Sequence, residues 1–371
     1  MARRVIHPTE LKIGQPLPGD AYDERGKLLL RQGQVITSVA QIEKLARHAL
    51  FAEIPGEAEP DEPALTSPLA LILAARSQLH RLFTAAAPTD FSAVLERIAG
   101  MVRQACKGNP DVALASILMR REGSYAIRHA VNVAIACHLT ATAMDLEAKE
   151  SRALLAAALT MNIGMFELQQ ELQSLDGPLD DAQYNAVRSH CERGVAMLHD
   201  YGVTQPLWLE IVRDHHERLD GSGYPHGRRG DEISRAARLL SLADVYCARV
   251  SGRDYRPPLQ ATVALRWLFL NEGGMVVDQR LAAQFIKTLG VYPPGTGVRL
   301  RNGSVAVVTH RGHAGHAPKV SSITTHDGLR IGAPIRRRGD EPAHAISEVV
   351  DLDALELEMG MEALWGTDAI G

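Results

Sequence analysis

The sequence predicts a mainly α-helical protein in which a multi-helix bundle follows a small α+β unit and precedes a β-rich tail. Between about residues 67 and 290, apolar side chains recur at spacings of three and four residues, the period of an amphipathic helix. Aromatic residues make up only 5% of the chain, whereas alanine and leucine are frequent. These patterns favour several antiparallel helices packed as a bundle.

The bundle helices are expected where the period of three to four residues is continuous. The four clearest segments are residues 69–87, 90–106, 126–144 and 147–168. Glycine and proline interrupt the pattern at residues 108–110, 176–178 and 220–227, where we expect turns.

Changes in composition predict four segments along the chain. Residues 1–54 alternate short apolar stretches with Gly, Pro and Asp, as expected for a small α+β unit, and residues 55–68 form an acidic, proline-rich linker. Residues 69–292 form the helical domain. Residues 293–371 form a tail rich in β-hairpins, with a turn at Asn302-Gly303 and an amphipathic segment at its end.

Charge and cysteine usage exclude several classes of protein. The 40 Lys and Arg residues nearly balance the 44 Asp and Glu residues, so the net charge of −4 argues against binding to a nucleic acid polymer. The four cysteines are widely spaced and predict reduced thiols rather than a disulfide framework. No apolar run approaches the roughly 20 residues that span a bilayer. We therefore expect a cytoplasmic protein without a membrane segment.

The residues that point to chemistry are polar side chains in otherwise apolar helical segments. Two adjacent histidines, His215 and His216, stand directly before a glycine-rich turn. His129, His190 and Asp244 lie on other predicted helices. Imidazoles and a carboxylate inside a helical bundle are typical of a transition-metal site. The alternative is that each is a buried polar group satisfied by hydrogen bonds.

The segment HHERLDGSGYPHG, residues 215–227, resembles the motif HHExxDGxGYPxG of the HD-GYP family. It matches at nine fixed positions within thirteen residues. The matches in the loop include Asp220, Gly221, Gly223, Tyr224, Pro225 and Gly227. His129 resembles the first histidine of the family, His190 with Gly194 its H-xxx-G element, and Asp244 its later aspartate. The resemblance covers about residues 115–290 and implies an HD-GYP-type helical bundle.

The resemblance implies a bacterial signalling protein in cyclic di-GMP pathways. Members of this family are metal-dependent phosphodiesterases that hold two or three metal ions, usually iron or manganese. Arg253 and Arg256 resemble the residues of the family that hold the substrate phosphates, and Tyr224 and Pro225 would contribute to the substrate site. The GYP loop, residues 220–227, also implies contacts with diguanylate-cyclase (GGDEF) domains.

This chain departs from the family at the His-Asp pair that gives the family its name. The corresponding residues are Met161 and Asn162, and Met165 replaces the lysine that follows the glycine. In the family the aspartate bridges two metals, whereas an amide carries no charge to screen two cations. Tyr125 occupies the position of a glutamate that serves a third metal in some members. A full binuclear centre is therefore not expected.

The ligands that remain suit one transition metal ion, which we expect to be iron, manganese or zinc. They are His129, His190, His215, His216 and Asp244, with Asn162 as a weak additional ligand. Whether the chain is an enzyme is left open by these replacements. We prefer a catalytically degenerate receptor for cyclic di-GMP or a related nucleotide, or an adaptor. The alternatives are an active metal-dependent cyclic di-GMP phosphodiesterase and a pure scaffold.

Three features in the tail carry weaker expectations. His310, His313 and His316 are spaced loosely like metal ligands, but a solvated loop is the preferred interpretation. The basic run at residues 336–338 is expected on a solvated surface. The apolar residues of the terminal segment could dock on the body of the protein or on a second subunit, which would make a homodimer.

Overall fold

The computed structural model describes most of the chain, and its helices and strands fall into two compact units, Met1–Leu65 and Thr66–Gly371. The described residues are 3–5, 14–17, 20–22, 27–37, 51–53, 67–85, 90–172, 177, 179–252, 258–270, 276–312, 318–357 and 359–371. The first unit contains an antiparallel sheet in the order β1-β4-β2-β3. Its strands are β1 (Arg3–Val5), β2 (Asp20–Tyr22), β3 (Leu28–Leu30) and β4 (Phe51–Glu53).

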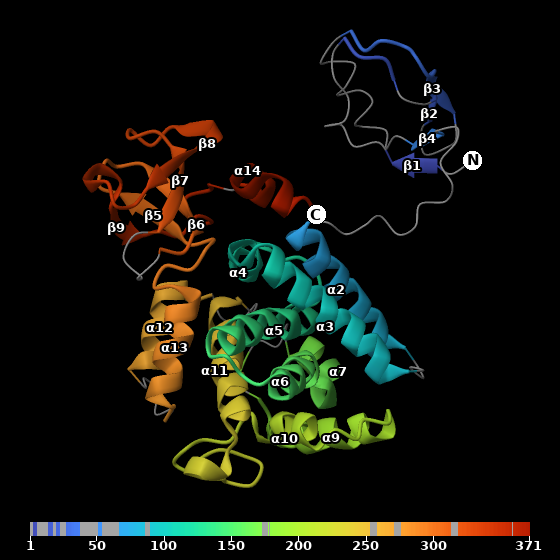
Figure 1. The fold of residues 1–371 in the computed structure, drawn as a ribbon, viewed down its shortest axis with the longest axis vertical. Coiled ribbons are helices and arrows are strands. Elements are labelled where there is room, and N and C mark those ends of the chain that lie inside the picture. The colour runs from blue at the N-terminus through green and yellow to red at the C-terminus, as the bar shows by residue number, and fades with distance from the viewer. Residues whose placement is uncertain are drawn as a thin grey trace. The chain divides into compact units, whose positions relative to one another are not determined.

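The second unit is a helical bundle with a small sheet at one end (Figure 1). Its first helices are α2 (Pro68–Thr84), α3 (Phe91–Gly108), α4 (Pro110–Met119), α5 (Tyr125–Ala143) and α6 (Ala148–Thr160). The short segments η2 (Ile163–Met165) and α7 (Phe166–Glu171) follow. Then come α8 (Asp181–Arg188), α9 (His190–Asp200), α10 (Pro206–Asp214), α11 (Arg235–Val250), α12 (Ala261–Phe269) and α13 (Gln279–Leu289). The predicted fold class, a mainly helical bundle with a β-rich C-terminal region, is confirmed.

Helix α5 lies at the centre of the bundle because apolar side chains surround it on nearly every side. Ala130, Val131, Val133, Ala134 and Ile135 are all at most 4% exposed. A helix that is apolar all round is buried in the core rather than laid on the surface. His129 is carried on this central helix, so its side chain is held inside the bundle.

One predicted helix is interrupted in the structure. The apolar pattern predicts a single helix over residues 147–168, but α6 ends at Thr160, and a turn at Met161 and Asn162 leads into η2. Gly164 of η2 lies against α9, where an added Cβ would stand 2.3 Å from the carbonyl oxygen of His190 and 2.5 Å from the nitrogen of Gly194. The close approach of η2 and α9 therefore requires a residue without a side chain at position 164.

The C-terminal sheet is antiparallel, with the strand order β8-β7-β6-β5-β9. Its strands are β5 (Gly297–Leu300), β6 (Val305–His310), β7 (Lys319–Thr324), β8 (Arg330–Arg338) and β9 (Ile346–Val349). The predicted turn at Asn302-Gly303 joins β5 to β6, and Gly303 has a φ of +90°. That conformation favours glycine.

The terminal segment docks on the body of the same chain. In α14 (Met361–Trp365), Leu364 and Trp365 join a buried cluster with Leu69 of α2 and Val112 of α4. The indole nitrogen of Trp365 donates to the carbonyl oxygen of Thr309 at 2.9 Å. The apolar face of this segment is thus covered by its own bundle.

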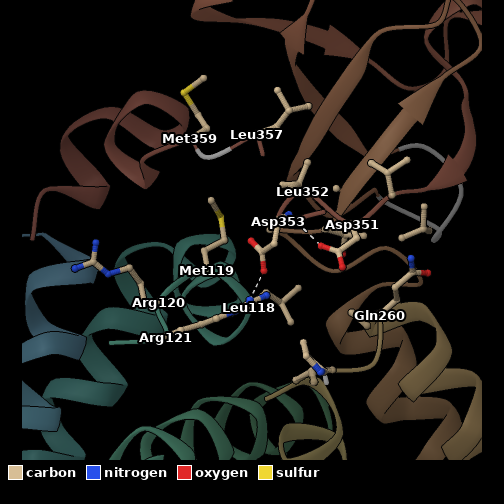
Figure 2. A pocket seen from close by; sticks show the side chains of 18 of the residues that line it. Leu118, Met119, Arg120, Arg121, Gln260, Asp351, Leu352, Asp353, Leu357 and Met359 are labelled. Carbon is tan, nitrogen blue, oxygen red and sulfur yellow. Dashed lines mark hydrogen bonds and ion pairs between the residues drawn. The ribbon is translucent and has the colours of Figure 1, made fainter. Parts of the chain in front are cut away.

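A pocket lies where the bundle meets the segment after β9 (Figure 2). Arg121, which follows α4, forms an ion pair with Asp353 across it. Leu352 and Met359 add apolar side chains to the lining. Among the described residues, no helix combines the length and the apolar character needed to cross a bilayer.

Candidate metal centre

Five segments of the bundle carry the candidate polar side chains. His129 lies on α5, Asn162 stands before η2, His190 is the first residue of α9, His215 ends α10, and Asp244 lies on α11. His129, His190 and His215 are at most 2% exposed and Asp244 is 8% exposed. Side chains far apart in the sequence therefore share the interior of the bundle.

His190 and His215 point their Nε2 atoms at each other across 3.4 Å. The Nδ1 of His190 donates to the carbonyl oxygen of Val187, and the Nδ1 of His215 donates to that of Val212 at 2.7 Å. A neutral imidazole has one donor and one acceptor nitrogen, so both Nε2 atoms present lone pairs. This carbonyl-oriented tautomer is typical of metal-ligating histidines.

Cys191 and His216 complete a cluster of four donors. One nitrogen from each of His190, His215 and His216 and the Sγ of Cys191 all lie within 4.8 Å of one another. Cys191 is fully buried, and its Sγ lies 3.5 Å from the Nε2 of His190. Among the described residues, this cluster combines the donors that a transition metal prefers.

Burial keeps these imidazoles neutral. Desolvation, helped by the neighbouring His215, lowers the pKa of His190 to about 3. Desolvation likewise lowers the pKa of His215, and it lowers that of His216 well below the usual range. The neutral form is the one that binds a metal ion. Burial also raises the pKa of the Cys191 thiol, so the uncharged thiol is favoured until a cation is bound.

His129 and Asp244 form a separate pair beside this cluster. The Nε2 of His129 lies 2.7 Å from the Oδ1 of Asp244. Burial opposes ionisation of this carboxyl group, but the hydrogen bond from His129 and electrostatic interactions with the surrounding imidazoles outweigh it, so the pKa of Asp244 lies far below its usual range. The structure therefore gives the Asp244 carboxylate a partner of its own within the site.

The replaced His-Asp segment leaves an uncharged edge to the site. Met161 is fully buried, as expected for a thioether in an apolar core. The Oδ1 of Asn162 is buried and has no hydrogen-bond partner. A buried amide oxygen without a partner costs free energy, and a nearby cation or water would relieve that cost. The role of Asn162 as a weak additional ligand stays a prediction.

The GYP loop is organised by Glu217. Its buried carboxylate accepts from the backbone nitrogens of His226 at 2.6 Å and Arg228 at 3.0 Å. A Cβ on Gly223 would lie 2.5 Å from backbone atoms of Glu217 and Arg218, so only glycine fits where the loop folds back. Glu217 matches the third position of the family motif, and in the structure its carboxylate holds the loop in place.

The other loop residues divide between structure and surface. The Oδ1 of Asp220 accepts from the backbone and hydroxyl of Ser222, which closes a local turn. Gly221 and Gly227 have φ values of +80° and +66°, which favour glycine. Tyr224, joined to Pro225 by a cis peptide bond, lays its ring 4.8 Å from that of His216.

Two further residues were missed by the sequence analysis. Cys191 follows His190 directly in the sequence, and this position next to a predicted metal ligand could have identified it as a candidate. The guanidinium of Arg188 lies 5.0 Å from the centre of the Tyr224 ring, so it places an exposed positive charge next to the GYP loop. The predicted phosphate ligands Arg253 and Arg256 lie outside the described residues.

The weaker candidates of the tail lie elsewhere in the chain. His310 ends β6, whereas His313 and His316 fall outside the described residues. The basic run at residues 336–338 belongs to β8, a largely exposed strand of the C-terminal sheet. None of these described residues belongs to the four-donor cluster.

A histidine-rich centre inside a helical bundle is compatible with an HD-type protein, and comparisons with known proteins identify that class. The HD domain family matches residues 95–281. The chain belongs to this family, within its HD-GYP branch.

Two curated relatives, both named as phosphodiesterases, illustrate the similarity. A cyclic di-GMP phosphodiesterase of Pseudomonas aeruginosa is 31% identical over 54% of this chain and 48% of its own length. A 3'3'-cGAMP-specific phosphodiesterase of Vibrio cholerae is 30% identical over 46% of this chain and 36% of its own length. The chain thus spans about half or less of these relatives.

A solved structure supports the fold. It is an HDG"Y"P protein from Bdellovibrio bacteriovorus, which superposes with a TM-score of 0.50 at 15% identity. The match covers 78% of this chain and 99% of that protein. At this level of identity the similarity concerns the fold alone.

Proposed function

We propose that this protein is a catalytically degenerate HD-GYP member that acts as a cytoplasmic receptor for cyclic di-GMP or a related cyclic dinucleotide. The observation that carries the proposal is Asn162, whose uncharged, unpartnered amide oxygen stands where the family has its bridging aspartate. Loss of that charge removes the group that screens two close cations from each other. A binuclear phosphodiesterase centre is therefore not supported by the residues present.

The residues that remain support a single metal ion and a nucleotide-binding surface. His190, His215 and His216 would hold the metal ion, which would supply a fixed positive charge beside the GYP loop. Next to it, Tyr224 offers an aromatic face, and Arg188 offers a guanidinium that can pair with a phosphate. Arg253 and Arg256 are proposed as further phosphate ligands on the resemblance alone.

The same surface supports an adaptor function. An adaptor would use the GYP loop to contact a diguanylate-cyclase (GGDEF) domain, with or without nucleotide. Retained hydrolysis is the second candidate, and it requires the amide oxygen of Asn162, which has no hydrogen-bond partner, to serve as a neutral metal ligand. A pure scaffold would use neither the metal nor the nucleotide.

The proposal is tested by calorimetric titration of the full chain with cyclic di-GMP. The metal content is measured on the same sample. We expect saturable binding and no linear or mononucleotide product on chromatography after addition of manganese or iron(II). Turnover that is abolished in a His215→Gln variant would contradict degeneracy and establish a phosphodiesterase. Absence of binding would contradict the receptor function and leave the adaptor or the scaffold.

The Arg188→Ala variant gives a sharper test of the surface. We expect at least about tenfold weaker nucleotide binding, since one charge-assisted pair is lost. The matched control is Arg152→Ala, which removes an exposed arginine from α6. Equal weakening by both variants would mean that Arg188 acts only through the general charge of the protein.

A further inference from the structure

Two donor separations in the cluster match the edges of a tetrahedron around one small cation. In a zinc site with bonds of about 2.05 Å to nitrogen and about 2.3 Å to sulfur, the nitrogen–nitrogen edge is about 3.3 Å and the nitrogen–sulfur edge about 3.6 Å. The separation between the Nε2 atoms of His190 and His215 is 3.4 Å, and the Sγ of Cys191 lies 3.5 Å from the same atom of His190. All four donors lie within 4.8 Å of one another.

The backbone holds these donors in place. Carbonyl oxygens of Val187 and Val212 fix the rings of His190 and His215, and Cys191 follows His190 on the same buried helical turn. His216 packs its ring 4.1 Å from that of His215 and 5.0 Å from that of His190. The cluster is thus built from buried or half-buried groups whose orientations are already set.

The neighbouring carboxylate does not complete this set. Asp244 is held by His129 at 2.7 Å, and Asn162 offers only a neutral oxygen. Within the four-donor cluster, Cys191 is the donor that can supply a negative charge to a bound cation. Thiolate sulfur with imidazole nitrogen is a soft donor set that favours zinc over manganese or iron(II).

We propose that this chain binds one zinc ion in a closed shell of three histidines and one cysteine, with Cys191 occupying the coordination position that a catalytic zinc leaves to water. On binding, the Cys191 thiol loses its proton to solvent and its sulfur bonds to the cation. A shell with four protein ligands is typical of structural sites, whereas catalytic sites keep one position open. The ion would then tie the start of α9 to the end of α10, just before the GYP loop.

This inference rests on the proposed function in one respect. A zinc ion with four protein ligands has no position left for a water molecule, which would explain the loss of hydrolysis that the proposed function assumes. Its first test needs no variant. X-ray absorption at the zinc edge of the zinc-loaded full chain should show one sulfur at about 2.3 Å and nitrogen neighbours at about 2.0–2.1 Å. A spectrum with only nitrogen and oxygen neighbours would overturn the proposal.

The second test replaces zinc with cobalt(II), whose visible spectrum reports its ligands. The wild-type protein should show a thiolate charge-transfer band and no change on addition of thiocyanate. The Cys191→Ala variant should lose the band and gain a thiocyanate response, because one position opens. The matched control, Cys106→Ser, changes a buried cysteine of α3 and should keep the wild-type spectrum.

Chelator competition adds a readout of affinity. We expect zinc to be held at least about tenfold more weakly by Cys191→Ala than by the Cys106→Ser control. A thiocyanate response in the wild type, or equal zinc affinity in the two variants, would contradict a closed shell.

Nucleotide titration of the same samples separates this proposal from the proposed function. A thiolate band without binding of cyclic di-GMP would uphold the zinc site and contradict the receptor. Binding without turnover, in a protein that lacks the band, would uphold the receptor and contradict the zinc site.

Discussion

His190 and His215 face each other with the lone pairs of their Nε2 atoms 3.4 Å apart inside the helical bundle. Each ring donates its Nδ1 proton to a backbone carbonyl, so neither nitrogen in the pair carries a proton to share. Two facing lone pairs in a low-dielectric interior repel each other unless a cation lies between them. This arrangement links the local geometry of α9 and α10 to metal binding.

Replacing His215 with glutamine should remove most of the bound metal. The amide keeps a similar polar volume but lacks the imidazole lone pair, so we expect the metal content to fall at least about tenfold. Metal analysis of the purified variant measures this. The control is His199→Gln, which changes an exposed histidine of α9. A wild-type metal content in the His215 variant would show that the cluster does not bind the ion.

Replacing Gly164 with alanine should displace α9 from η2. The added Cβ would meet the His190 carbonyl oxygen at 2.3 Å, so the backbone has to move. We expect a destabilisation of about 1–3 kcal/mol and weaker metal binding, because the clash lies at His190 itself.

Urea unfolding and metal analysis check the Gly164 variant. Gly332→Ala in β8 is the matched control, since an added Cβ there meets nothing within 4 Å. Normal metal binding despite lost stability would mean that η2 supports the fold but not the site.

Replacing Glu217 with glutamine should loosen the GYP loop. One oxygen that accepts a backbone N–H becomes an NH₂ group, which faces another donor. We expect a loss of about 1–3 kcal/mol in the free energy of unfolding, together with faster proteolysis within the loop. Glu192→Gln, an exposed change on α9, should leave both measurements unchanged.

Acid should destabilise the metal-free protein before its carboxylates titrate. The pKa of His190 falls from 6.5 in the unfolded chain to about 3 in the folded protein. The unfolded state therefore binds more protons below pH 6.5, so this contribution to stability is complete above that pH and is lost as the pH falls toward 3. Between pH 7 and pH 5 the loss from this one group is about 2 kcal/mol.

Urea unfolding in the presence of a chelator at the two pH values measures this loss. Substitution of His190 by glutamine should reduce the dependence by about 2 kcal/mol, because one of the buried titrating imidazoles is removed, and His215 and His216 should retain theirs. An identical free energy of unfolding at pH 7 and pH 5 in the wild-type chain would be inconsistent with a buried neutral His190.

Local sequence patterns predict the helical class and the turn at Asn302-Gly303, which the structure confirms, and they name the histidines that stay the predicted metal ligands. Each of these signals depends on residues that are close together in the sequence. They are the helical periodicity, the preferred conformation of glycine and a motif with nine matched positions. The break between α6 and η2 was not predicted, since the apolar pattern continues through Met161. That break depends on the close packing of Gly164 against α9.

The packing of the helices sets which side chains share the centre. It separates the pair of His129 and Asp244 from the four-donor cluster, and it places the thiol of Cys191 within that cluster. In the sequence, Cys191 is one of four widely spaced cysteines, each an equally plausible core residue. Donor atoms converge through the packing of helices far apart in the chain, and sequence spacing does not record those distances.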